Sequence, residues 1–277
     1  MKTVTLPSGA VVAALGQGTW NMGERAAARA EELASLRLGL DLGMSLIDTA
    51  EMYGEGRAEE LVGEAIAGRR DEAFIVSKVY PHNASRHGTL AACERSLKRL
   101  KTDRIDLYLL HWRGETPLAE TFDAFGKLQR AGKIVHFGVS NFSIEDMREC
   151  LTIEYGQALA VNQVLYNLSR RGIEWDLLPW LGQHHIPLIA YSPIEQARLL
   201  RNPRLRRFAR DRSMTPAQAA LAWLLAREQL IAIPKAAHRD RVRENAGALD
   251  HPLTTAQMRE LDALFAPPSA ATALEML

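Results

Sequence analysis

The sequence is poor in the features that mark secreted, membrane-spanning and polyanion-binding proteins. Cys93 and Cys150 are its only cysteines, and two scattered thiols form no disulfide framework, so a reducing compartment fits better. Lys and Arg total 34 against 33 Asp and Glu, and this near-neutral balance gives no reason to expect a polyanionic partner. No stretch approaches the ~18 apolar residues of a membrane span, and the N-terminus lacks the apolar run of a signal peptide. We therefore expect a soluble cytoplasmic protein that binds neither nucleic acid nor membrane.

The sequence also lacks the features that would divide it into domains. It has 277 residues, of which 47% are hydrophobic, and this length alone fits one large or two ordinary domains. No linker rich in Pro, Gly or Ser, no low-complexity tract and no long charge block interrupts it before the tail. We therefore expect a single domain over residues 1–277, and we expect a monomer.

Short apolar runs rich in Val, Ile and Leu alternate along the chain with longer segments of helical period. The runs predict strands within residues 11–20, 45–50, 74–80, 105–112, 134–141, 159–166, 186–193 and 230–237. The intervening segments predict helices over residues 26–42, 59–67, 89–100, 118–131, 144–151, 173–184, 216–228 and 239–249. Thr215 and Pro216 fit an N-cap followed by proline at the first helical position.

This strict alternation of strands and helices favours parallel strands covered on both faces. Eight such units indicate a closed (β/α)₈ TIM barrel of the α/β class. An open doubly wound sheet would need a glycine fingerprint after its first strand, and the spacing of Gly16, Gly18 and Gly23 does not match it. We also expect an N-terminal β-hairpin over residues 4–12, an extra C-terminal helix over 254–265, and a final loop packed on the surface over 266–277.

Polar side chains stand where the predicted strands end, and in such a barrel the active site lies at those ends. The residues in question are Asp48, Lys78, His111, Trp112, Ser140, Asn141, Asn162, Gln163, Tyr191, Ser192 and Lys235, with Tyr53 in the loop after the second strand. Burying a polar group beside apolar neighbours is costly unless it is paired. Taken singly, Asp48 could be a helix cap, Tyr53 a packing residue and His111 a structural histidine. Four ionisable residue types converging on one rim favour a functional site.

These strand ends resemble those of the aldo-keto reductase family, and the likeness extends over nearly the whole chain. "GMSLIDTAEMYG", "GKIVHFGVSNF" and "IAIPKAAHRDRVRENA" resemble the three family signatures in order, and "VSKVY" and "LLHW" match the strand ends that carry the family's Lys and His. The pattern is closest to small prokaryotic members that reduce methylglyoxal and similar carbonyls. The resemblance implies NADPH-dependent reduction of small aldehydes and ketones, with Asp48, Tyr53, Lys78 and His111 as catalytic residues.

The resemblance also implies a division of labour among these residues. Tyr53 would donate the proton to the carbonyl oxygen while the nicotinamide supplies the hydride. An ammonium favours the phenolate, so we expect Lys78, held by Asp48, to lower the pKa of Tyr53. His111 would orient and polarise the substrate.

By the same resemblance, Tyr191 would stack on the nicotinamide, and Lys235 and Arg241 would hold the 2′-phosphate and favour NADPH. The full set implied for the cofactor is Trp20, Asp48, Ser140, Asn141, Gln163, Tyr191, Ser192, Pro193, Ile194, Gln196, Ile233, Lys235, Ala236, Arg241, Glu244 and Asn245. Ala236 stands where the family often has Ser or Thr, so one hydroxyl for the 2′-phosphate is missing. The substrate pocket is expected to use Trp20, Tyr53, Tyr80, His111 and Trp112, with His82 beside them.

Two other functions fit a barrel of this kind. Some barrels of the family serve as nicotinamide-sensing subunits of larger assemblies with little turnover, and the intact catalytic set favours catalysis over this role. A metal-dependent hydrolase would need histidine pairs at strand ends, which the sequence lacks, so we expect no metal site. The arginines of residues 201–212 are interpreted as a solvated helix face, because only one aromatic residue, Phe208, stands among them.

Overall fold

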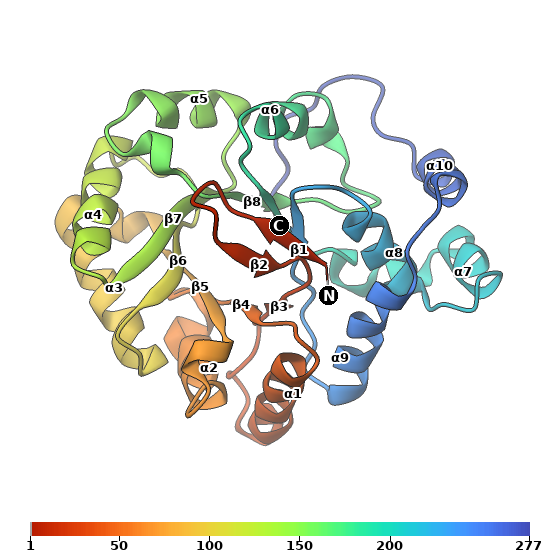
Figure 1. The fold of residues 1–277 in the computed structure, drawn as a ribbon, viewed down its shortest axis with the longest axis horizontal. Helices are drawn as coiled ribbons and strands as arrows, with labels where there is room; N and C mark the ends of the chain where they lie inside the picture. Colours follow the sequence, from red (N-terminus) through yellow and green to blue (C-terminus); the bar gives the residue numbers. More distant parts are fainter. Residues whose placement is uncertain (1) are drawn as a thin grey trace.

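The structure is a computed structural model that describes residues 2–277, and its centre is an eight-stranded parallel sheet (Figure 1). The strands follow one another in chain order from β3 to β10, and each pairs in parallel with the next. They are β3 (Gln17–Gly18), β4 (Leu46–Asp48), β5 (Phe74–Val79), β6 (Ile105–Leu110), β7 (Ile134–Ser140), β8 (Asn162–Leu165), β9 (Leu188–Tyr191) and β10 (Leu230–Ala232). Neighbouring parallel strands need a crossover connection, and helices provide it here.

The first and last strands of this sheet meet and close it into a barrel. The backbone N–H of Gly16 donates to the carbonyl of Ala232 at 2.8 Å, and the N–H of Gly18 donates to Pro234 at 3.0 Å. In return the N–H of Ala232 donates to Ala14 at 2.8 Å. The closed sheet confirms the predicted barrel, and the doubly wound alternative is excluded because an open sheet has two free edges.

Helices surround the strands in the ring drawn in Figure 1. They are α1 (Arg29–Asp41), α2 (Arg57–Ala65), α3 (Arg86–Leu100), α4 (Leu118–Arg130), α5 (Ile144–Thr152), α6 (Leu177–Gln183), α7 (Pro203–Arg210), α8 (Pro216–Leu225), α9 (Arg239–Ala246) and α10 (Thr255–Leu264). The predicted helices are confirmed with ends shifted by a few residues. One of them, over 173–184, is divided into a 3₁₀ turn, Gly172–Glu174, and α6, because Asp176 caps a new helix by accepting from the N–H of Leu177 at 2.5 Å.

The additions at the two ends of the chain are present. Strands β1 (Thr3–Thr5) and β2 (Val11–Ala13) form the expected antiparallel hairpin. Because β2 takes the first residues of the apolar run 11–20, only Gln17 and Gly18 remain for β3. Helix α10 matches the expected C-terminal helix. Residues 266–277 form neither helix nor strand, as expected, but they are not only a surface loop, because the end of the segment enters the central cavity described below.

The arginine-rich segment forms α7 and its flanks. Leu205, Phe208 and Ala209 are buried where α7 packs against α8 and α10, whereas Arg204 and Arg207 are exposed. This division follows the helical period and matches the interpretation as a solvated face. Among the residues that the structure describes, no helix is long and apolar enough to cross a membrane.

Candidate active site

A buried ion pair lies at the centre of the strand ends. Lys78 on β5 is fully buried, and its Nζ lies 2.8 Å from both carboxylate oxygens of Asp48, the last residue of β4. The ammonium also donates to the carbonyl of Thr49 at 2.9 Å. Its neighbour Ser77 bonds Glu59 of α2 outside the barrel at 2.5 Å, and alternation along the strand therefore points Lys78 inward. Burial lowers the pKa of Lys78, and the charge of Asp48 opposes this change.

Tyr53 is brought over this pair by a tight turn, Tyr53–Gly56, that follows β4. Gly54 and Gly56 have φ of 55° and 92°, in the left-handed region that favours glycine. The turn places the Tyr53 hydroxyl where Lys78 Nζ donates to it at 3.3 Å. Asp48, Lys78 and Tyr53 thus form one chain of contacts.

The acidity of Tyr53 differs from the sequence-based expectation. Burial raises the pKa of Tyr53 well above its ordinary value, and the nearby carboxylate of Asp48 raises it further. The pKa of Tyr53 therefore shifts upward overall, and Tyr53 carries its proton throughout the neutral range. The lowering of this pKa by Lys78 stays a prediction.

His111 follows β6 directly and faces Tyr53. The two ring centroids lie 5.7 Å apart in an edge-on arrangement. Burial lowers the pKa of His111 well below its ordinary value, and the ammonium of Lys78 lowers it further. Its Nδ1 is buried and has no hydrogen-bond partner among the described residues. His111 is therefore neutral near pH 7 and lies beside Tyr53.

Polar side chains from β7, β8 and β9 complete the opposite side of the site. Gln163 Nε2 donates to Asp48 Oδ1 at 2.7 Å, across the barrel. Asn141 Nδ2 donates to the carbonyl of His111 at 3.1 Å, and the Tyr191 hydroxyl donates to Asn141 Oδ1 at 2.9 Å. These bonds fix the orientation of the side chains that border the ion pair.

The expected position of Asn162 and Gln163 at the end of a strand is wrong, because these two residues begin β8. The register pairs Gln163 with Ser140, the last residue of β7. Strands of a barrel are staggered, so the start of β8 lies level with the end of β7, and Gln163 still reaches the site. Asn162 instead donates from Nδ2 to the carbonyl of Phe142 at 2.9 Å.

These side chains surround a cavity of about 410 Å³ at the strand ends. Its size falls in the range of small-molecule and cofactor pockets. Of the expected site residues it is lined by Trp20, Asp48, Tyr53, His111, Trp112, Ser140, Asn141, Gln163, Tyr191, Ser192, Pro193, Ile194, Gln196, Ile233 and Lys235. Lys78 lies directly beneath, in contact with Asp48 and Tyr53. Residues from eight separate segments of the chain thus meet at one mouth of the barrel.

The remaining expected residues do not line the cavity. Tyr80 stands behind Trp112, with ring centroids 5.0 Å apart, and stacks on His82 at 4.6 Å. Arg241 of α9 is exposed and forms an ion pair with Glu244 at 2.6 Å. The others outside the lining are Ala236 and the buried Asn245. Their assignments to substrate or cofactor stay predictions.

The cavity also has a part that the sequence did not indicate. Its lining includes Gly18, Thr19, Asn21, Met52, Ala197, Met276 and Leu277. The last two belong to the C-terminal tail, and both are about half exposed. No motif marks a tail that returns to the barrel mouth, so only its apolar ending, "LEML", was available as a signal.

The chain belongs to the aldo/keto reductase family, whose sequence profile matches residues 14–266. It is therefore an oxidoreductase, and the resemblance drawn from the motifs is confirmed. It is 48% identical to methylglyoxal reductase YeaE of Escherichia coli (strain K12) over 95% of each chain. It is 36% identical to glyoxal reductase of Bacillus subtilis (strain 168), over 84% of this chain and 83% of that one.

Solved structures agree with this assignment. The aldo-keto reductase from Klebsiella pneumoniae, crystallised in complex with NADPH, is 49% identical to this chain, and the superposition has a TM-score of 0.97. It covers 100% of this chain and 99% of that one. The thermostable aldo-keto reductase Tm1743 is 39% identical, with a TM-score of 0.89 over 95% of this chain and 100% of that one.

Proposed function

We propose that this protein uses NADPH to reduce small aldehydes and ketones of the methylglyoxal type, with Tyr53 as the proton donor. The observation that carries the proposal is the contact between the Tyr53 hydroxyl and Lys78 Nζ, at 3.3 Å, at the base of the cavity. The His111 ring lies edge-on to the Tyr53 ring, with centroids 5.7 Å apart. Three groups thus lie together: a proton donor, a cation that can stabilise its conjugate base, and a neutral imidazole.

The cavity has groups that suit a nicotinamide cofactor with a 2′-phosphate. Lys235 is exposed and lines the cavity, so its ammonium is available to a phosphate. Tyr191 presents an aromatic ring to the same cavity, and Ser140, Asn141 and Gln163 present amide and hydroxyl groups. The complex of the Klebsiella pneumoniae relative with NADPH supports the same cofactor here. When bound, NADPH supplies the hydride that reaches the carbonyl carbon.

The chain's own residues then account for the proton. Tyr53 holds its proton at neutral pH because burial raises its pKa, and it releases the proton only as negative charge develops on the carbonyl oxygen. The phenolate left behind accepts a hydrogen bond from the Lys78 ammonium, which Asp48 keeps in place. His111, neutral for the reasons given above, donates a hydrogen bond to the same oxygen and orients the carbonyl.

The walls of the cavity favour a small substrate. Trp20, Met52, Trp112, Met276 and Leu277 make the space beside Tyr53 largely apolar and aromatic. Few polar groups remain to recognise a large polyhydroxylated compound. The names of the two bacterial relatives, methylglyoxal reductase and glyoxal reductase, point to short dicarbonyls.

The test is oxidation of NADPH by the purified protein with methylglyoxal and with 4-nitrobenzaldehyde. Tyr53→Phe removes the proton and leaves the ring, so we expect turnover to fall ~10²–10⁴-fold while the dissociation constant of NADPH changes little. Tyr155→Phe is the matched control, because its hydroxyl lies outside the cavity and accepts a hydrogen bond from Arg130 at 2.7 Å.

Three results would contradict parts of the proposal. Undiminished turnover in Tyr53→Phe rejects Tyr53 as the acid. Tight NADPH binding without turnover across a broad carbonyl panel supports the nicotinamide-sensing role instead. Failure to bind NADPH at all rejects both.

A further inference from the structure

Three segments that are distant in the sequence meet beside the cavity. They are the β8 loop, residues 166–175; the β9 loop, residues 192–197; and the tail, residues 266–277. The β9 loop and the end of the tail both line the cavity, and the β8 loop lies behind them and bonds to each. The two cavity walls are therefore held by a common support.

The β9 loop is held in a strained conformation. Ser192, Glu195, Gln196 and Ala197 have φ of 47°, 50°, 51° and 68°, and none of them is glycine. Left-handed backbone costs ~1–3 kcal/mol for each such residue and persists only where its surroundings hold it. The conformation must therefore be fixed by contacts from outside the loop.

Those contacts come from the β8 loop and centre on one buried carboxylate. Asn167 Nδ2 donates to the carbonyl of Ser192 at 2.9 Å and to Glu195 Oε2 at 2.8 Å. Arg170 donates to Glu195 Oε1 from Nε at 3.1 Å and from a terminal nitrogen at 2.9 Å. Glu195 is almost fully buried. These bonds balance its charge in the observed shape of the β9 loop, and Arg198 adds a longer ion pair at 3.5 Å.

The same β8 loop fixes the path of the tail. Arg171 donates to the carbonyl of Phe265 at 2.6 Å, where α10 ends, and Trp175 Nε1 donates to the carbonyl of Pro268 at 2.8 Å. Further along, Arg170 donates to Glu275 Oε1 at 2.5 Å. The tail is therefore attached near its start, at Phe265 and Pro268, and near its end, at Glu275.

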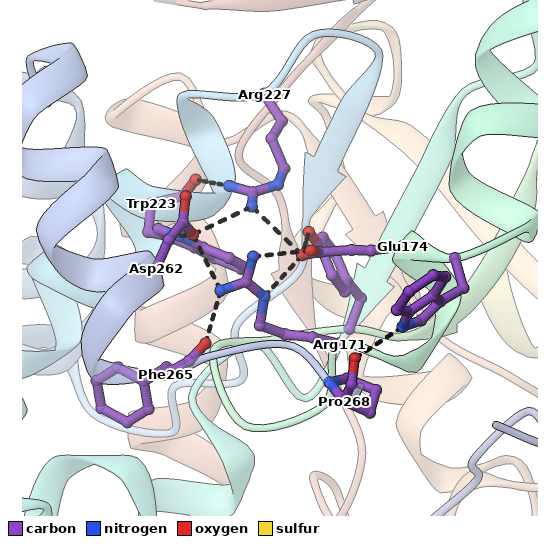
Figure 2. A network of polar contacts seen from close by, with 9 residues as sticks. Arg171, Glu174, Trp223, Arg227, Asp262, Phe265 and Pro268 are labelled. Carbon is purple, nitrogen blue, oxygen red and sulfur yellow. Dashed lines mark hydrogen bonds and ion pairs between the residues drawn. The ribbon is translucent and has the colours of Figure 1, made fainter. Parts of the chain in front are cut away.

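Figure 2 shows how the first of these attachments is made rigid. The guanidinium groups of Arg171 and Arg227 lie between the carboxylates of Glu174 and Asp262. The Arg227 guanidinium lies 3.6 Å from the ring centroid of Trp223, whose Nε1 donates to Asp262 at 3.0 Å. Planar bidentate groups in a closed network leave little freedom of orientation. The start of the tail is thus fixed to the barrel, and Glu275 joins the end of the tail to the β9 loop through Arg170.

The residues that follow Glu275 reach the active site. Met276 and Leu277 line the cavity, as Tyr191 does. Arg170 thus bonds both Glu195, which shapes the loop on the cofactor side, and Glu275, which places the wall on the substrate side.

We propose that Arg170 is a positioning residue that couples the cofactor wall of the cavity to its substrate wall. The proposal rests on the proposed function, because it takes the β9 loop to border bound NADPH. A cofactor that favours the observed shape of the β9 loop then also favours the observed position of Arg170. Because Arg170 bonds Glu275, the cofactor also favours the observed positions of Met276 and Leu277. Binding of NADPH is expected to order the tail, and a disturbed tail is expected to alter the choice of carbonyl.

The test compares Glu275→Gln, Glu195→Gln, Arg170→Met and Arg170→Lys with the control Arg210→Met. Arg210 is an exposed arginine of α7 that pairs only with its neighbour Asp211. Each variant is measured for its NADPH dissociation constant by fluorescence titration and for KM and kcat with methylglyoxal and 4-nitrobenzaldehyde. Hydrogen exchange of the amides of residues 270–277 is followed with and without NADPH.

The proposal predicts a different result for each position. Glu275→Gln should raise the KM for methylglyoxal roughly fivefold, because coupling between sites typically changes affinity ~5–150-fold. The ratio of this KM to the KM for 4-nitrobenzaldehyde should change as well. The NADPH dissociation constant should stay within about twofold of wild type. Glu195→Gln should weaken the binding of NADPH. Arg170→Met should weaken the binding of NADPH and also raise the KM for methylglyoxal. NADPH should slow exchange of the tail amides in the wild type and in Arg210→Met, but not in Arg170→Met.

Arg170→Lys keeps the positive charge at this position, but a lysine cannot bond two carboxylates in the forked geometry of a guanidinium group. It should fold as the wild type does and still lose the effect of NADPH on the tail, so the test stands even if Arg170→Met does not fold. If NADPH slows tail exchange equally in Arg170→Lys and wild type, or slows it in neither, the coupling is wrong. A wild type that fails to bind NADPH or to reduce any carbonyl overturns the proposed function itself, whereas an active wild type with unaltered variants overturns only this inference.

Discussion

Replacing Asp48 by Asn tests whether the buried ion pair is held together as described. Asparagine keeps the shape of the side chain and an oxygen for Gln163, but it removes the charge opposite Lys78. Lys78 is fully buried and has no other carboxylate within hydrogen-bonding distance among the described residues. The variant therefore leaves an ammonium in the barrel that only neutral oxygens contact.

The size of the effect follows from this burial. Removing one partner of a buried ion pair typically costs ~3–5 kcal/mol, because the remaining charge stays without compensation. The whole free energy of unfolding of a protein is ~5–15 kcal/mol. At ~2–4 °C for each kcal/mol in a chain of this size class, we expect the melting temperature to fall by about 6–20 °C.

The dependence of this loss on pH identifies its cause. Burial already lowers the folded pKa of Lys78, and the loss of Asp48 lowers it further. Between that folded pKa and the ~10.4 of an unfolded lysine, the unfolded state binds more protons, so stability rises with pH. Below the folded pKa of Lys78 in wild type, only the variant gains stability in this way. The deficit of Asp48→Asn relative to wild type should therefore shrink as pH rises from the folded pKa of Lys78 in the variant to that in wild type.

The assay is urea-induced unfolding at several pH values for Asp48→Asn, Lys78→Met and the double variant. Replacing both partners by neutral groups of similar size removes the unpaired charge, so the double variant should be more stable than Asp48→Asn, although inactive. A loss below about 1 kcal/mol for Asp48→Asn, or a double variant as unstable as the sum of the single ones, would refute the argument.

Three further predictions follow from the same geometry. Burial holds the folded pKa of His111 below the ~6.5 of an unfolded histidine. Its contribution to stability is therefore complete above pH ~6.5 and is lost as pH falls below it. His111→Gln should flatten the curve of stability against pH in this range, and an unchanged slope would contradict the prediction. Lys235→Met should lower the affinity for NADPH more than the affinity for NADH in a titration. Arg241→Ala should do the same only if Arg241 leaves Glu244 when the cofactor binds. An equal loss of affinity for both cofactors in Lys235→Met would exclude a contact between Lys235 and the 2′-phosphate. Burial raises the pKa of the Cys93 and Cys150 thiols to about 12 each, so a thiol reagent should modify neither before urea unfolds the protein, and rapid labelling of the native state would show that they are accessible.

The fold was readable from the sequence because its signals are local. Each apolar run and each helical segment is short, and the rule that joins parallel strands through helices does the rest. The error at Asn162 and Gln163 has a physical origin: the stagger of barrel strands depends on pairing with β7 and β9, and neither partner lies nearby in the sequence. The division of the predicted helix 173–184 near Asp176 was not predicted, because a single capping side chain can start a helix inside a continuous helical pattern.

The sequence by itself determined which residues stand at the barrel mouth. Asp48, Lys78 and His111 each close an apolar run, and strand ends of a parallel barrel meet on one side wherever the strands come from in the chain. The tertiary structure alone decided how these groups behave and what surrounds them. The pKa of Tyr53 rises instead of falling, because desolvation and the balance of neighbouring charges depend on every side chain that excludes water. The tail reaches the cavity because Arg170 and its neighbours bond to it across the fold, and contacts between such distant segments leave no periodic trace in the sequence.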